Sequence, residues 1–126
     1  MMKKSYPKNP NRIITYRFDA TKTPLGRLAS EVAKAVQGKL LPSYRPEKIS
    51  QVRIIIQNIN QVAVSGKKIN AKKYFRYTGY PGGIKSKRMG DLFKSNPQQF
   101  FINVVKNMLP NNKLRIRMIK KIQFMK

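Results

Sequence analysis

The stretch TPLGRLASEVAKAVQG, residues 23–38, is the clearest structural signal in the chain. Its apolar side chains recur every three or four residues, which is the period of a helix that buries one face. Thr23 is placed to cap this helix, Pro24 suits its first position, and Gly38 ends it. The pattern therefore predicts an amphipathic helix packed on a hydrophobic core.

Strand patterns lie on both sides of this helix. The segment 14–19 alternates apolar and polar residues, as in a strand that buries one face. After an extended basic loop at 39–51, the apolar run at 52–58 predicts a buried strand, and a shorter strand is expected at 62–64.

The charge balance is strongly basic. The chain has 126 residues, with 28 Lys or Arg against 4 Asp or Glu, so its formal net charge is +24. This length fits one domain with a modest core, and 40% hydrophobic residues exclude a disordered composition. A compact domain of this charge repels itself unless something neutralises it, so the expected partner is a polyanion.

Several classes of protein are disfavoured by what the sequence lacks. Without Cys or His, there is no disulfide framework, no thiolate chemistry and none of the usual zinc sites, so no metal or cofactor is expected. No apolar run approaches the roughly 20 residues of a membrane helix, so no membrane partner is expected either. Residues 1–12 are predicted to be a basic flexible arm, either a binding arm or a frayed end without a role, and 13–126 a single RNA-binding domain.

The segment 67–88 combines positive charge with aromatic rings. It holds eight cations and no acid, interleaved with Phe75 and three tyrosines. Cations provide affinity for phosphate, and exposed rings stack on unpaired bases, whereas Phe75 and one tyrosine are expected to belong to the core. An ordinary solvated surface mixes both signs of charge, so this segment favours nucleic-acid binding.

Helical patterns return towards the C-terminus. They predict a short helix at 89–95 and a longer one from 97 until Pro110 stops it. In the last segment, Leu114, Met118 and Ile122 recur at four-residue spacing, which predicts a third helix with cations around its apolar stripe.

Catalysis is the weaker interpretation. The only acids are Asp19, Glu31, Glu47 and Asp91, which are too widely spaced to suggest a two-carboxylate site. The segment 82–86, GGIKS, lacks the glycine spacing of a phosphate-binding nucleotide loop. Two alternatives stay open: a free-standing nucleic-acid binding module, and a small α/β enzyme acting on an anionic substrate.

Five short motifs occur in series from about residue 14 to the C-terminus. They are Asp19-Ala20, then LGRLAS at 25–30 leading to Gly38-Lys39, then SGKK at 65–68, then Lys73-Tyr74 with TGYPGG at 78–83, and finally MLP at 108–110 with Asn112 and Leu114. Each motif alone is weak, but their unbroken order closely resembles the bacterial-type large-subunit ribosomal protein family thirteen.

This resemblance implies an α/β fold, a single three-layer α/β/α domain with a small, mostly parallel four-stranded sheet and basic loop extensions. It implies a structural, non-enzymatic role in the large ribosomal subunit, in the cytoplasm of a bacterium or the matrix or stroma of an organelle. The implied partners are large-subunit ribosomal RNA and neighbouring ribosomal proteins, with no small-molecule substrate.

The resemblance also implies a set of RNA-facing positions. They are Arg27, Lys39, Lys67, Lys68, Lys72, Lys73, Tyr74, Arg76, Tyr80, Gly82, Gly83, Lys85, Asn112 and Lys113. The charge pattern adds Arg88 and Arg117 as further candidates for contact with RNA.

Overall fold

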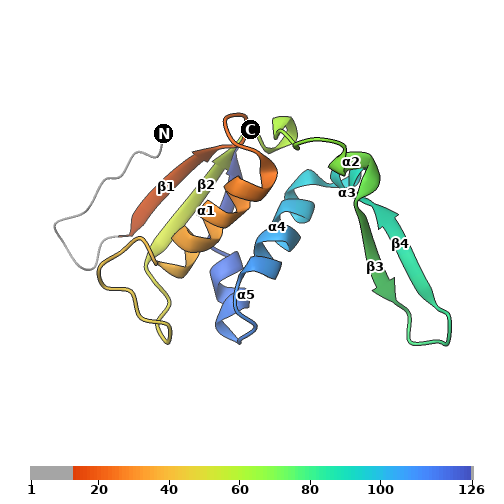
Figure 1. Cartoon of the computed structure of the whole chain (residues 1–126). Helices are drawn as coiled ribbons and strands as arrows, with labels where there is room; N and C mark the ends of the chain where they lie inside the picture. Colours follow the sequence, from red (N-terminus) through yellow and green to blue (C-terminus); the bar gives the residue numbers. More distant parts are fainter. Residues whose placement is uncertain (1–12, 126) are drawn as a thin grey trace.

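A parallel sheet of three strands forms the centre of the computed structural model, which describes residues 13–125 (Figure 1). The elements in chain order are β1 (Ile14–Asp19), α1 (Leu25–Gln37), β2 (Val52–Gln57), the 3-10 helix η1 (Ile59–Gln61), α2 (Lys68–Ala71), β3 (Lys73–Tyr77), β4 (Ile84–Arg88), α3 (Met89–Ser95), α4 (Pro97–Met108), α5 (Leu114–Ile119) and β5 (Ile122–Met125). The expected α/β class is confirmed.

The register of the sheet brings the apolar side chains of three strands onto one face. β2 lies in the middle and pairs in parallel with both β1 and β5. Tyr16 aligns with Ile54, and Ile54 aligns with Ile122, so all three point to the same side. Ile54 and Ile56 are fully buried there.

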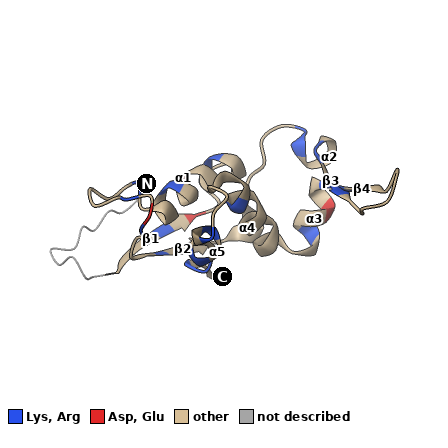
Figure 2. Ribbon diagram, turned by 90° about the horizontal axis from the view of Figure 1, so that it is seen from below, with Lys and Arg blue, Asp and Glu red and all other residues tan. Residues whose placement is uncertain are grey.

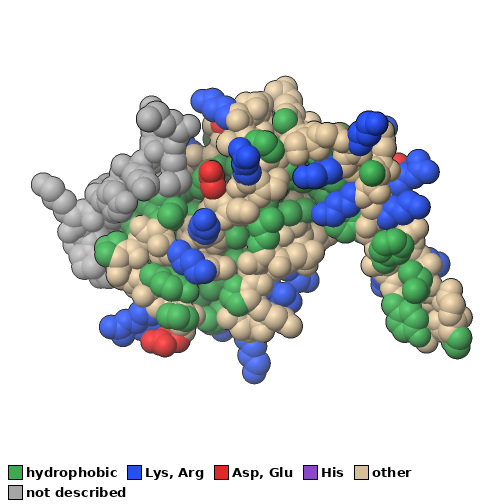
Figure 3. All heavy atoms as spheres, viewed as in Figure 1, with side chains coloured by type: hydrophobic (Ala, Val, Ile, Leu, Met, Phe, Trp, Pro, Cys, Tyr) green, Lys and Arg blue, Asp and Glu red, His purple; other side chains and the backbone are tan. Residues whose placement is uncertain are grey.

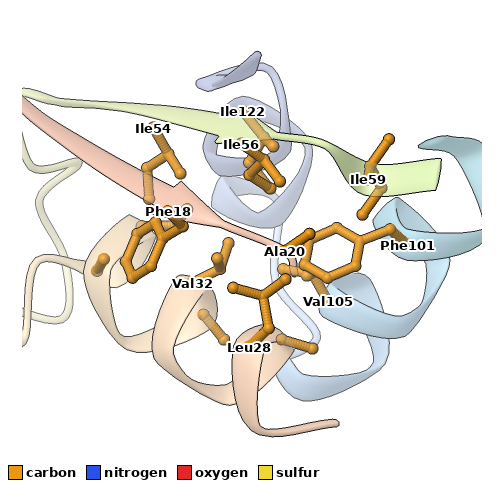
Figure 4. Close-up of a cluster of buried hydrophobic side chains, with 14 of the residues drawn as sticks. Phe18, Ala20, Leu28, Val32, Ile54, Ile56, Ile59, Phe101, Val105 and Ile122 are labelled. Carbon is orange, nitrogen blue, oxygen red and sulfur yellow. The ribbon is translucent and has the colours of Figure 1, made fainter. Parts of the chain in front are cut away.

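Helices α1 and α4 pack against each other and cover this apolar face. The helix predicted from residues 23–38 is confirmed as α1, and its Leu28 and Val32 point into the core (Figure 4). Phe101 and Val105 of α4 meet them from the neighbouring helix (Figure 4). Because β1 and β5 lie on opposite sides of β2, right-handed crossovers place both connections on one face of the sheet.

The other face of the sheet has no helix over it within residues 13–125. Arg17 and Arg53 are exposed on that face, and Ile55 is half-buried between the neighbouring strands. This part of the chain therefore forms two layers, helices on a sheet, where three layers were expected.

The strand predicted at 62–64 is wrong, and the sheet has three strands in the described residues instead of four. This segment follows η1 and pairs with no strand. The backbone carbonyl of Ala63 instead accepts a hydrogen bond of 2.9 Å from the N–H of Leu25, and so satisfies the first turn of α1. The prediction failed because a short apolar run does not reveal its hydrogen-bonding partner.

The start of α1 also differs from its prediction. Pro24 occupies the N-cap position, and Thr23 does not cap the helix, since its buried hydroxyl has no hydrogen-bond partner among the described residues. Gly38 ends the helix as predicted, with a left-handed φ of 82°.

The C-terminal helices are confirmed at α3 and α4, but the last segment changes from helix to strand. α5 ends at Ile119, and Ile122 begins β5 instead of continuing the helical stripe. The free edge of β2 explains this change, because the N–H of Ile54 donates to the carbonyl of Lys121 at 3.0 Å and parallel pairing follows. The basic arm expected at 1–12 lies outside the described residues.

Candidate nucleic-acid interface

The hairpin of β3 and β4 projects away from the three-stranded sheet (Figure 1). Its turn is closed at Gly83, whose carbonyl accepts hydrogen bonds from the N–H and the Oγ1 of Thr78, at 2.9 and 2.7 Å. The N–H of Gly83 donates to the carbonyl of Tyr80 at 2.9 Å. Gly79 and Gly82 have φ values of 90° and 70°, a left-handed backbone that favours glycine. The glycines of the TGYPGG motif are thus explained by the turn itself.

The antiparallel register gives this hairpin two different faces, because side chains alternate across a strand. The face that we call the basic face carries Tyr74, Arg76, Lys85 and Lys87. The face that we call the apolar face carries Lys73, Phe75, Tyr77, Ile84, Ser86 and Arg88. Figure 3 shows hydrophobic side chains gathered on the projecting hairpin.

The expected core position of Phe75 is wrong. Its side chain is 70% exposed on the apolar face, because the hairpin extends beyond the body of the protein. Tyr80, in the turn, is 76% exposed. The tyrosine that packs is Tyr74, whose ring meets that of Phe100 on α4 and also lies beneath the Nζ of Lys72, 5.3 Å from the ring centroid.

The base of the hairpin adds further predicted cations. Lys67 and Lys68 stand at the start of α2, and the Nζ of Lys68 donates to the Oγ of Ser65 at 3.4 Å. The carbonyl of Lys72 accepts from the N–H of Met89 at 2.9 Å, which ties the entrance of β3 to the start of α3. Figure 2 shows cationic segments on α2, β3 and α3 close together. The candidates from 67 to 88 therefore form one continuous region.

A second group of predicted residues meets at a groove on the body of the domain. This groove, of about 470 Å³, lies between the end of α1, the loop after it and the turn that joins α4 to α5. Lys39 and Asn112, far apart in the sequence, both line it. Lys113 follows directly, and all three are exposed.

The remaining two candidates lie apart from the hairpin. Arg27 is exposed in the first turn of α1, and Arg117 is exposed on α5. The predicted residues therefore divide between the hairpin region and the body of the domain.

Some residues of the hairpin were not among the predicted candidates. Lys87 completes the basic face, and Tyr77 and Ile84 form part of the apolar face. The signal that could have found them is the alternation of KYFRY at 73–77 and IKSKR at 84–88 around a Gly-rich turn, which is typical of a hairpin.

The acidic residues have no arrangement suited to catalysis in the described chain. Asp19 closes a turn after β1, where its Oδ1 accepts hydrogen bonds from the N–H and the Oγ1 of Thr21, at 3.1 and 2.8 Å. These bonds, with a weaker one from Asn58, lower the pKa of Asp19. The other three acids are exposed, and residues 13–125 contain no cluster of three potential metal ligands.

None of the helices in the described range is both long and apolar enough to cross a membrane.

Comparison with known proteins confirms the family resemblance seen in the sequence. A family model described as ribosomal protein L13 matches residues 12–125. The large ribosomal subunit protein uL13 of Natranaerobius thermophilus is 38% identical over 124 residues, which cover 97% of this chain and 87% of the relative. The protein of the same name from Aquifex aeolicus is 41% identical over 105 residues, 83% of this chain and 73% of the relative. The chain therefore belongs to the ribosomal protein L13 family.

Proposed function

We propose that this chain is a structural, non-enzymatic component of the large subunit of a bacterial-type ribosome. In this role it binds ribosomal RNA, contacts neighbouring ribosomal proteins, and supports subunit assembly and translation. Membership of the ribosomal protein L13 family supports the role, and its relatives are named as large-subunit proteins. The surface of the hairpin supports the mode of binding.

The observation that carries the mode of binding is the pairing of like charges across the hairpin. Lys73 lies directly opposite Arg88, and Arg76 lies directly opposite Lys85. Directly opposed residues of an antiparallel pair have Cβ atoms about 4.5–5.5 Å apart, and like charges in this position are destabilising. No acidic residue lies on β3 or β4. A phosphate backbone along the hairpin would relieve this repulsion, because each phosphate neutralises the cations beside it.

The exposed rings supply the second part of the proposed interaction. Phe75, Tyr77 and Tyr80 present aromatic surface that no other part of residues 13–125 covers. Such rings stack on unpaired bases, so the hairpin combines phosphate contacts with stacking contacts. The proposed interface comprises the predicted RNA-facing residues of the hairpin region and of the body, together with Lys87.

The test is a salt titration of the binding of full-length chain to large-subunit ribosomal RNA. The double variant Arg76→Ala with Lys85→Ala should flatten the dependence of log affinity on log salt by about 2 units, because two phosphate contacts are lost. The matched control is the double variant Lys34→Ala with Lys106→Ala, which removes two exposed cations on helices outside the proposed interface, and it should leave the slope unchanged. An unaltered slope in the hairpin variant would place Arg76 and Lys85 away from the RNA.

Sedimentation of cell extracts tests the ribosomal role itself. The chain should comigrate with the large subunit at low salt. A pool that is mainly free of ribosomes would instead favour a free-standing nucleic-acid binding module.

A further inference from the structure

The groove on the body of the domain is lined in part by apolar side chains, which a surface that binds only phosphate does not need. Met118 lines the groove but is only 3% exposed, because it also belongs to the hydrophobic core. Met108 and Tyr44, which line the groove as well, are 41% and 38% exposed. Its volume of about 470 Å³ falls within the range of clefts that hold small organic molecules, about 300–1,000 Å³. An aromatic ring and two thioethers thus provide apolar surface for a flat ligand.

Two side-chain amides stand among these apolar walls. Gln37, the last residue of α1, is only 8% exposed and is the one buried polar residue of the described chain. Asn112 accepts a hydrogen bond at its Oδ1 from the N–H of Arg115 at 3.0 Å, and its Nδ2 group donates to no residue within 13–125. Amides can both donate and accept hydrogen bonds, so they match the edges of nucleobases.

Electrostatics distinguish the inside of the groove from its rim. Gln37 marks the C-terminal end of α1, where the helix dipole is negative and disfavours an anion. Lys39 is exposed just beyond this end, and the loop that follows carries Arg45 and Lys48 beside the single acid Glu47. A neutral group therefore suits the interior, and an anionic group suits the rim.

We infer that this groove holds one unpaired base of the bound RNA, stacked on Tyr44, with its adjoining phosphate at Lys39. This inference rests on the proposed function, and it specifies which part of the RNA, a single unpaired nucleotide, binds in the groove. A base provides the flat, neutral body and the hydrogen-bonding edge that the interior requires, and the phosphate provides the negative charge that the rim requires. A leucine or phenylalanine side chain from a neighbouring protein would leave both amides and Lys39 unused.

Methyl NMR of the full-length chain, labelled with ¹³C at its methionine methyl groups, tests this directly. The probes are AMP, GMP, CMP and UMP, with adenosine as the phosphate-free control and ribose 5-phosphate as the base-free control. We expect at least one nucleotide to shift the Met108 and Met118 signals saturably. Met125 lies outside both the groove and the hairpin region and should not shift. Adenosine should still bind if AMP does, more weakly, whereas ribose 5-phosphate should have no effect on Met118.

Several outcomes would overturn the inference. Absence of any saturable shift at Met108 and Met118 would do so, and so would equal shifts with ribose 5-phosphate and with nucleotides, which would show binding of phosphate alone. Binding of N-acetylleucinamide as tight as that of the best nucleotide would identify a protein side chain as the occupant.

Variants separate the stacking contact from the charge contact. Tyr44→Ala should weaken nucleotide binding about fivefold or more, as expected for the loss of one stacked base, whereas Tyr44→Phe should retain it. Lys39→Gln should weaken binding of the nucleotide but not of adenosine, and this exposed change leaves the core untouched. Ile13→Ala removes an exposed apolar side chain outside both the groove and the hairpin, so it is the control and should leave nucleotide binding at the groove unchanged. Equal binding by Tyr44→Ala would refute the stacking.

The outcomes that would refute the groove as a base-binding site differ from those that would refute the proposed function. Comigration with the large subunit and a hairpin-dependent salt slope, without any nucleotide binding at the groove, would refute the groove alone. Loss of comigration with the large subunit would refute the ribosomal role, whether or not nucleotides bind in the groove.

Discussion

The ring of Tyr74 meets the ring of Phe100 edge to face, with centroids 5.7 Å apart and planes at 87°. Tyr74 belongs to β3 of the hairpin, and Phe100 is buried in α4, so this contact joins the projecting hairpin to the core. Phe93 of α3 meets Phe100 in the same geometry at 6.1 Å. The orientation of the hairpin is therefore set by aromatic packing at its base, while its tip stays exposed.

Removal of this contact should loosen the hairpin before it affects the core. Tyr74→Ala should raise the rate of amide hydrogen exchange across 73–88, because an aromatic pair contributes about 0.5–1.5 kcal/mol beyond its buried area. Exchange in β2 should stay slow, and Tyr74→Phe is the control that retains the ring. Unchanged exchange at 73–88 in Tyr74→Ala would show that the contact does not hold the hairpin.

The exposed ring of Tyr80 should matter for RNA and not for folding. Tyr80→Ala should change the free energy of unfolding by less than about 0.5 kcal/mol, as for other exposed positions. It should weaken binding to ribosomal RNA by about 1–3 kcal/mol if the ring stacks on a base. Thermal unfolding and filter binding measure the two effects. A less stable variant with undiminished RNA affinity would contradict this prediction.

The turn of the hairpin should not tolerate a side chain at Gly83. A Cβ there would clash with the Oγ1 of Thr78 and lie 3.0 Å from the carbonyl oxygen of Tyr80, so Gly83→Ala must displace the Thr78 hydroxyl from its hydrogen bond to the Gly83 carbonyl and distort the turn. Amide exchange and cross-strand NOEs at 77–84 should report the disruption. Gly26→Ala is the control, because its Cβ meets no atom within 4 Å in a helix, and it should leave the hairpin intact.

The core face of α1 should be sensitive to truncation. Leu28 is 1% exposed, so Leu28→Ala should lower the free energy of unfolding by about 2–5 kcal/mol, from lost transfer energy and the cavity that remains. Lys34→Ala on the exposed face of the same helix is the matched control, with an expected change below about 0.5 kcal/mol. Urea unfolding of both variants measures the difference. A cost of only a few tenths for Leu28→Ala would refute the assigned face.

Asp19 should make the stability of the domain depend on acid pH. Hydrogen bonds from Thr21 hold its pKa below the ordinary value of 3.8, so the folded state favours the carboxylate more than the unfolded state does. This stabilisation is present in full above the unfolded pKa and is lost as the pH falls through the folded pKa. Asp19→Asn should therefore flatten the fall in Tm over the acid range. An equally steep fall in the variant would exclude Asp19 as the cause.

Local patterns in the sequence were sufficient where one element buries its own stripe. The apolar period of α1 and the alternation of β1 depend only on residues within each element, and both predictions were confirmed. Ile122 could not be assigned in this way. Its four-residue spacing from Met118 continues the helical pattern, but the strand that it pairs with, β2, lies more than 60 residues earlier in the chain. Phe75 failed for the same reason, since its exposure depends on where the whole hairpin projects.

The sequence by itself determined the family, the excess of positive charge and the segments that carry it, because these are properties of residue order and composition. Tertiary structure alone decided that Tyr74 packs on Phe100, that Phe75 is exposed, and that Lys39 and Asn112 line one groove. Each of these outcomes depends on how segments that are distant along the chain pack together. Backbone pairing and packing of the core place such residues together, and no local periodicity encodes that placement.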